Sequence, residues 1–339
     1  MERELDALGV RGSRQPGAIE FEASIAQGAT LTRRARTPTR LLLTIAEGPA
    51  VHARQLADLI GSTDWTPFLR RDTTVKLHIT TRDSKLRFKD RIQRTAERAL
   101  KGVQRRLPPG PSADQRLHIR LADDRARLAL DAGGELLHRR GWRQDTGKAP
   151  LRENLAACLL FAAGYTGDEV LLDPFCGVGT IPIEAALLAS GRSAFSDREM
   201  AWRSWHGVSD LPVAPPPAMT APCAIIGSDK SETAIGRAQA NAGRAAADVR
   251  WQTSDIAELE PPAPSGLIVT NPPYGRRLGQ SVDGVYRAFG RTLRARFDGW
   301  RVLFLCPNRA LAGLVDQRAE RLTTFSNGGA RVGIWVLGA

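Results

Sequence analysis

The chain has 339 residues, of which 42% are hydrophobic and 25% charged, enough for two or three domains with a sizeable core. No stretch approaches the length of a membrane span, and the start Met-Glu-Arg-Glu-Leu is not that of a signal peptide. The four cysteines lie far apart without a CxxC pair, which indicates neither a disulfide framework nor a zinc site. We therefore expect a soluble, cytoplasmic monomer that holds no metal and binds no membrane.

Most of the positive charge lies in the first half of the chain. The formal net charge is +12, from 48 basic and 36 acidic residues. Residues 1–150 hold 29 basic and 18 acidic residues, a net charge of +11, so the remaining 19 basic and 18 acidic residues leave +1. A basic surface can serve solubility alone, but an excess confined to one half is expected when one module grips a polyanion and another does chemistry.

The first half is predicted to contain two small α+β modules. Residues 1–48 combine a helix at 3–8 with strands near 18–23 and 40–46, as in a ferredoxin-like unit that lacks its usual first strand. Residues 49–142 form the second module, with a helix at 51–60, a strand at 74–80, a helix at 85–101 and a hairpin that pairs 116–121 with 127–131.

A stripe of cations follows the helix predicted at 85–101. Helical spacing places Arg87, Arg91, Arg94, Arg98 and Lys101 on it, beside an apolar stripe of Phe88, Ile92, Ala96 and Leu100. A charged stripe is usually only a solvated face. This one carries almost a single sign, and Arg33, Arg34 and Arg36 add a second cluster. We therefore predict that Arg33, Arg34, Arg36, Arg87, Arg91, Arg94 and Arg98 contact nucleic-acid phosphates.

After a connector at 143–154, strands and helices alternate. Strands are predicted at 169–172, 224–227, 249–253, 266–270 and 301–306, helices at 151–164, 181–190, 231–246 and 283–297, and closing segments at 321–325 and 333–337. The alternation predicts an α/β fold with a doubly wound, mostly parallel sheet over residues 155–339. Residues 191–222 are predicted to form an irregular insertion or lid, whose role stays open.

A glycine-rich turn joins the first of these strands to its helix. It reads Asp173-Pro174-Phe175-Cys176-Gly177-Val178-Gly179-Thr180, and its glycines allow a ligand close to the backbone. A dinucleotide site fits poorly, because the third glycine of GxGxxG would fall at Pro182. An acidic ribose partner does appear at Asp229, after the strand at 224–227, but it follows Gly179 by 50 residues instead of roughly 20.

An acid before the glycines suits an ammonium group, which favours S-adenosylmethionine, an amino acid joined to a nucleoside. Asp173 would face its amino-acid end, Asp229 the ribose hydroxyls and Asp255 the adenine amino group, with Ile256 against the ring. Each acid alone is as readily a helix cap or a surface charge. Four successive strand ends with suitable groups favour the cofactor.

The fourth of these strand ends carries Asn271-Pro272-Pro273-Tyr274, directly after the apolar run 266–270. The Asn271 oxygen and the Pro272 carbonyl can accept N–H bonds from a conjugated amine and turn its lone pair toward an electrophile. Pro273 stiffens the turn, and Tyr274 can stack on the flat group that bears the amine. These four residues are the predicted catalytic set.

Together these motifs resemble the THUMP-domain RNA methyltransferases, especially the guanine-N2 enzymes acting on large-subunit rRNA or on tRNA. The resemblance also covers the connector 137–143, the segment 149–155 and the closing Ser326-Asn327-Gly328-Gly329. It implies a ferredoxin-like module at 1–48, a THUMP RNA-binding domain at 49–142 and a Rossmann-like class I methyltransferase domain with a seven-stranded sheet. By the family pattern, Pro150 and Leu151 line the cofactor site. The complete predicted cofactor set is Pro150, Leu151, Asp173, Cys176, Gly177, Gly179, Thr180, Asp229, Lys230, Asp255, Ile256 and Asn271.

The expected activity is methyl transfer from S-adenosylmethionine to an exocyclic base amine of rRNA or tRNA, with guanine N2 favoured by the resemblance. Adenine N6 offers an equally conjugated amine, and a non-catalytic RNA-binding protein is a further alternative that the intact glycine turn disfavours. A protein glutamine amide would leave the basic half without a purpose. Cys176 as a nucleophile is disfavoured, because it lies in the cofactor turn rather than beside the base.

Overall fold

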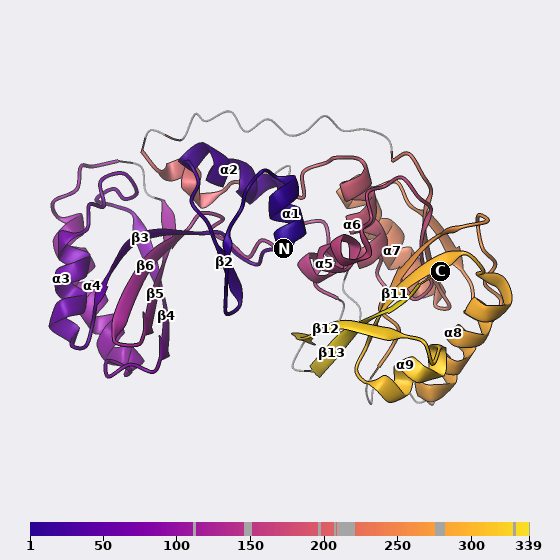
Figure 1. Cartoon of the computed structure of the whole chain (residues 1–339). Coiled ribbons are helices and arrows are strands. Elements are labelled where there is room, and N and C mark those ends of the chain that lie inside the picture. The colour runs from indigo at the N-terminus through magenta and orange to yellow at the C-terminus, as the bar shows by residue number, and fades with distance from the viewer. Residues whose placement is uncertain are drawn as a thin grey trace. The chain divides into compact units, whose positions relative to one another are not determined.

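The computed structural model describes residues 1–110, 113–145, 151–195, 198–206, 208, 221–274, 282–327 and 330–338. The chain folds into two compact units (Figure 1). Unit 1 comprises Met1–Gly9 and the described residues of 138–195 and 221–338. Unit 2 comprises Val10–Leu137 and the described residues among 198–208.

A four-stranded sheet covered by two helices forms the centre of unit 2. The strands lie in the order β3 (Leu42–Pro49), β6 (Arg125–Asp131), β5 (Asp114–Ala122) and β4 (Thr74–Arg82), of which β4 and β5 are parallel. Alternate residues of β5, including Leu117, Ile119 and Leu121, are buried, as the period of two requires. Helices α3 (Ala53–Ser62) and α4 (Lys89–Gln104) lie together at one side of this sheet (Figure 1).

Three smaller elements complete unit 2. A two-stranded ribbon joins β1 (Ser13–Gln15) to β2 (Ala18–Glu20), and the helix α2 (Ile25–Arg34) follows it. A 3-10 turn, η1 (Ala201–Ser204), comes from the predicted insertion 191–222. Its neighbours attach it firmly, because the Trp202 indole N–H donates to Thr32 Oγ1 at 2.9 Å and the Gln115 amide donates to Ser204 Oγ at 2.8 Å.

Two sequence predictions in unit 2 need correction. The boundary at 48/49 stays a prediction, and β3, which pairs along its length with β6 in the four-stranded sheet, spans it. The helix α2 was missed, although Ser24 and Gln27 form a capping box that a Ser-x-x-Gln pattern signals. Helix α4 begins at Lys89 instead of Lys85, since residues after β4 form a turn in which the Lys85 amide donates to Asp124. The other domain boundaries stay predictions.

Unit 1 contains the predicted doubly wound sheet. Its seven strands lie in the order β12 (Glu320–Asn327), β13 (Ala330–Leu337), β11 (Trp300–Cys306), β10 (Gly266–Thr270), β7 (Leu171–Asp173), β8 (Ile225–Asp229) and β9 (Arg250–Thr253). The five strands from β11 to β9 are parallel, and β13 is antiparallel to both of its neighbours. The mostly parallel α/β prediction is confirmed.

Both faces of this sheet are covered by helices (Figure 1). Ile268, Val302 and Phe304 share one core with residues of α8 (Val282–Arg296) and α9 (Arg309–Val315). Leu267 and Leu303, which alternate with them along the strands, share the other core with α5 (Glu153–Ala163) and α6 (Thr180–Ala189). Strands that are apolar at successive positions are buried on both faces, as parallel sheets require.

Two further helices belong to unit 1. Helix α7 (Glu232–Ala245) follows β8, and α1 (Glu2–Ala7) at the start of the chain reaches α5, where the Arg3 guanidinium donates to the Phe161 carbonyl at 3.3 Å. Among the described helices of both units, none has the length and apolar character of a bilayer span. The cytoplasmic compartment stays a prediction.

Candidate functional site

Four polar strand ends meet at one edge of the sheet in unit 1. Strands β10, β7, β8 and β9 are parallel neighbours, so their carboxyl ends lie along the same edge. Asp173 and Asp229 end β7 and β8, and Asp255 and Asn271 follow β9 and β10 closely. The Thr270 hydroxyl joins two of these tips directly by donating to Asp173 Oδ1 at 2.6 Å.

The glycine-rich turn is held against the tip of β8. The Gly177 amide donates to Asp229 Oδ2 at 2.9 Å, and the Cys176 amide donates to the Ser228 carbonyl at 2.9 Å. Gly177 and Gly179 have φ angles of +54° and +85°, which favour glycine. A Cβ at Gly179 would lie 2.7 Å from the Trp251 ring, whereas a Cβ at Gly177 would meet nothing within 4 Å. The turn is therefore closed below Gly179 and open beside Gly177.

Asp173 is the most strongly perturbed acid of this edge. Its side chain is 1% exposed, and burial raises the pKa of its carboxyl to about 7. Hydrogen bonds from the Thr270 hydroxyl and the Phe175 amide stabilise the ionised form and oppose the increase in pKa. A carboxyl whose pKa is strongly raised by burial is typical of functional sites.

The other predicted cofactor residues lie at or near the same edge. Asp255 Oδ1 accepts from the Ala257 amide at 2.9 Å, Ile256 and Leu151 are buried, and Lys230 is exposed directly after β8. Thr180 begins α6 behind the glycines. Pro150 lies outside the described residues, so its predicted place is untested.

Cys176 is suited to packing rather than to attack. Its side chain is buried, and burial raises the pKa of its thiol well above the usual value. The thiolate is the nucleophilic form of cysteine, and it is scarce at neutral pH in such surroundings. All four cysteines are free, and no group of three His, Cys, Asp or Glu side chains within the described chain is arranged to hold a metal.

At the tip of β10, Asn271 keeps a buried acceptor that no described residue satisfies. Its Oδ1 has no hydrogen-bond partner among the described residues. Pro272 is buried, and Pro273 and Tyr274 are half-buried. The Asn327 amide donates to the Tyr274 hydroxyl at 2.9 Å, and burial raises the pKa of that hydroxyl. An unpaired buried oxygen is costly in a folded protein, so it marks a place where a donor is expected.

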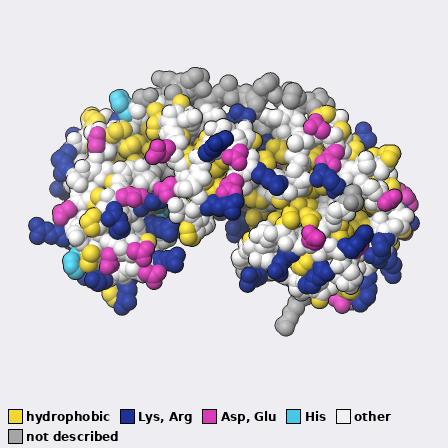
Figure 2. Space-filling model, viewed as in Figure 1, with side chains coloured by type: hydrophobic (Ala, Val, Ile, Leu, Met, Phe, Trp, Pro, Cys, Tyr) yellow, Lys and Arg dark blue, Asp and Glu magenta, His cyan; other side chains and the backbone are white. Residues whose placement is uncertain are grey.

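The predicted phosphate contacts in unit 2 divide by exposure. Arg91, Arg94 and Arg98 are exposed on α4, and Arg87 is exposed just before it. Dark-blue side chains mark the edge of unit 2 where α3 and α4 lie (Figure 2). In the second cluster only Arg34 is exposed. Arg33 is half-buried, and Arg36, 4% exposed, is placed to hold the fold rather than to meet a phosphate.

Sequence reasoning missed several residues that build this edge. Thr270 is visible in hindsight as the polar end of an apolar run, but its bond to Asp173 is not. Trp251 packs under Gly179, and Asn241 donates to the Val178 carbonyl at 3.1 Å. Asn327 lies 53 residues after Tyr274 in the chain, so no local pattern reveals their contact.

Comparison with known proteins agrees with this geometry. Residues 140–332, more than half of the chain, match the model of the RMKL-like methyltransferase domain. The chain belongs to this family. It is 33% identical over 366 residues to ribosomal RNA large subunit methyltransferase K/L of Methylococcus capsulatus, covering 96% of this chain and 48% of that protein. The resemblance and the class I methyltransferase fold expected from the sequence are confirmed.

Two further relatives extend the comparison. The Synechocystis protein slr0064 is 30% identical over 356 residues, covering 96% of this chain and 92% of that protein. The crystal structure of SMU.472 complexed with SAH superposes with a TM-score of 0.87 at 25% identity, covering 99% of this chain and 93% of that chain. The chain spans about half the length of the K/L relatives that it matches.

Proposed function

We propose that this protein is an S-adenosylmethionine-dependent RNA methyltransferase that modifies an exocyclic base amine, with guanine N2 as the favoured target. The observation that carries the proposal is the buried Asn271 Oδ1, which lacks a donor among the described residues at the strand tip next to the glycine turn. An aryl amine supplies that donor. Names of the K/L relatives support large-subunit rRNA as the substrate class.

The residues present fit the cofactor. The space beside Gly177 leaves room for a ligand at the backbone, and three carboxylates line the same edge. Asp229 already accepts from the Gly177 and Ser231 amides, but a carboxylate has about four acceptor sites, so it can still accept from ribose hydroxyls. We assign Asp173 to the amino-acid end and Asp255 to the adenine amine. The similar SMU.472 was crystallised in complex with SAH, which supports a cofactor of this kind.

The protein's part in the reaction is to hold and orient the amine. Bound S-adenosylmethionine supplies an electrophilic methyl group on a positively charged sulfur. Asn271 Oδ1 and the Pro272 carbonyl accept the two N–H bonds, which turns the nitrogen lone pair toward that methyl. Transfer would form a carbon–nitrogen bond at the expense of the carbon–sulfur bond, which would leave a neutral sulfur and a nitrogen that releases one proton to water. Tyr274 stacks on the base and keeps it in the plane that attack requires.

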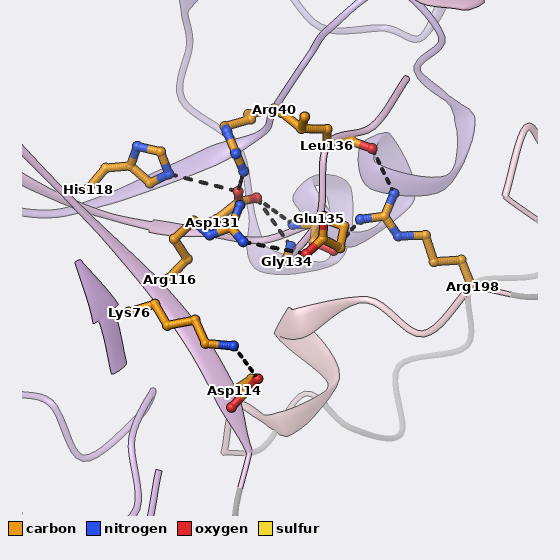
Figure 3. Close-up of polar contacts among 11 residues, drawn as sticks. Arg40, Lys76, Asp114, Arg116, His118, Asp131, Gly134, Glu135, Leu136 and Arg198 are labelled. Atoms are coloured by element: carbon orange, nitrogen blue, oxygen red, sulfur yellow. Dashed lines mark hydrogen bonds and ion pairs between the residues drawn. The ribbon is translucent and has the colours of Figure 1, made fainter. Parts of the chain in front are cut away.

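RNA phosphates are assigned to the exposed arginines of α4. Within the described chain, Arg91, Arg94 and Arg98 form no ion pair. Some cations on the strands of unit 2 are already paired, as with Lys76 and Asp114 at 2.8 Å (Figure 3). In the same view Arg40 and His118 point to Asp131. Free guanidinium groups can replace the counterions of a phosphate backbone, whereas paired ones must first lose their partners.

The test measures methyl transfer and cofactor binding separately. We expect Asn271→Ala to lose transfer from radiolabelled S-adenosylmethionine to rRNA while calorimetry finds little change in cofactor affinity. Mass spectrometry of the nucleosides then identifies N2-methylguanosine. Detection of N6-methyladenosine instead would show that the target is adenine. Cofactor binding without transfer to any RNA would show that the protein only binds. Wild-type turnover by Asn271→Ala would refute the assigned role.

A further inference from the structure

An exposed aromatic ring stands at the start of the basic helix α4. Phe88 is 65% exposed, more than any other large hydrophobic side chain of the described residues, and it is the only aromatic among those exposed. A single exposed apolar residue is common on protein surfaces and needs no explanation. The surroundings of this one are unusual, because Arg91, Arg94 and Arg98 follow it along the helix without an ion-pair partner in the described part of the chain.

The position of Phe88 is fixed by the backbone. It is the N-cap of α4, and its carbonyl accepts from the amides of Arg91 and Ile92, both at 3.1 Å. Ile92 is buried in unit 2, which anchors the first turn. The backbone that carries the ring is thus held at the start of a rigid element, so little backbone entropy is lost when a ligand covers the ring.

Cations lie close to the ring along the chain. The Arg87 guanidinium lies 5.6 Å from the ring centroid, and Arg91 is exposed one turn into the helix. Arg94 and Arg98 continue the same exposed row. An aromatic platform next to available guanidinium groups is complementary to an unpaired nucleotide, because the base has a flat apolar face and the phosphates carry negative charge.

We propose that Phe88 and α4 form a binding surface for unpaired RNA, on which Phe88 stacks against a nucleobase while Arg91, Arg94 and Arg98 contact the flanking phosphates. This proposal rests on the RNA-directed function proposed above and specifies the substrate class as RNA with an exposed single-stranded segment. A-form duplex hides the faces of its bases, and its deep, narrow major groove excludes a side chain carried on a helix. Duplex RNA can therefore meet the arginines but not the ring.

The experiment compares two RNA forms on the full-length protein. Affinities are measured for a single-stranded RNA oligonucleotide and for a blunt duplex that contains the same strand. We expect Phe88→Ala to weaken single-strand binding by roughly 5- to 150-fold, the loss of one base–aromatic stack, and to leave duplex binding unchanged. Phe88→Trp should bind the single strand at least as tightly as the wild type, because the larger ring preserves the stack.

Two matched variants separate stacking from charge. Arg94→Gln should weaken both RNA forms and reduce the slope of log affinity against log salt by about 0.7 for the single strand, whereas Phe88→Ala should leave the slope unchanged. Leu322→Ala removes another exposed apolar side chain, 53% exposed in unit 1, and should change neither affinity.

Three outcomes would overturn the proposal. They are wild-type affinity of Phe88→Ala for the single strand, equal losses for both RNA forms, and a Phe88→Trp variant as weak as Phe88→Ala. If the wild-type protein methylates RNA, any of these results refutes the proposed stacking surface but not the proposed methyltransferase function. If the wild-type protein neither binds nor methylates RNA, both the stacking surface and the methyltransferase function are refuted.

Discussion

Replacing Asp173 by asparagine should stabilise unit 1 at neutral and alkaline pH. Burial raises the pKa of the folded carboxyl from 3.8 to about 7. Below pH 3.8 the carboxyl is protonated in the folded and unfolded chains, and the stability that comes from its raised pKa is fully present. As the pH rises toward 7 the unfolded chain loses the proton first, so the free energy of unfolding falls by about 4 kcal/mol in total.

The asparagine variant keeps the local hydrogen bonds but not the charge. The Thr270 hydroxyl and the Phe175 amide both donate to Oδ1, and an amide oxygen in that place can accept both. The stability of Asp173→Asn relative to the wild type should therefore grow by about 3 kcal/mol between pH 5 and pH 8. The same variant should bind S-adenosylmethionine more weakly, as expected where a destabilising buried acid serves function.

Urea unfolding followed by hydrogen exchange of the β7 and β10 amides measures unit 1 alone. The control is Thr270→Val, which removes a donor to the ionised carboxylate and so raises the pKa of Asp173 further. The free energy of unfolding of this variant should therefore fall more between pH 5 and pH 8 than that of the wild type. A stability difference between Asp173→Asn and wild type that is the same at pH 5 and pH 8 would show that Asp173 does not titrate in this range, and the reasoning would fail.

The remaining predictions concern the glycine turn and the base site. Gly179→Ala should destabilise unit 1 by about 2–5 kcal/mol in urea unfolding, because it adds a left-handed alanine and a collision with Trp251, whereas Gly177→Ala should cost only about 1–2 kcal/mol. Equal losses in the two variants would contradict the packing argument. Tyr274→Phe and Asn327→Ala should each raise the KM for RNA, and the double variant should be no worse than the worse single variant, since both remove one hydrogen bond of about 1 kcal/mol. Additive effects would mean that the two side chains act separately.

Much of the architecture was predictable because it depends on local patterns. The apolar runs that precede Asp173, Asp229 and Asn271 identified three neighbouring strands, and their alternation with helices required a parallel sheet with all carboxyl ends on one edge. Chain order and that rule suffice to bring the acids, the glycine turn and the Asn-Pro-Pro-Tyr segment to the same edge. Where local signals were ambiguous the prediction failed, as at Phe88, which helical spacing assigned to the buried stripe.

The sequence by itself therefore determined which segments form the strands of the parallel sheet, which residues lie at the strand tips, and the class of chemistry that those residues suit. Only the tertiary structure decided which of these groups are satisfied. It paired Asp173 with Thr270, joined Tyr274 to Asn327, buried Arg36 and left Asn271 Oδ1 without a donor among the described residues. Burial and hydrogen bonding depend on residues far apart in the chain, and no periodicity encodes contacts at such separations.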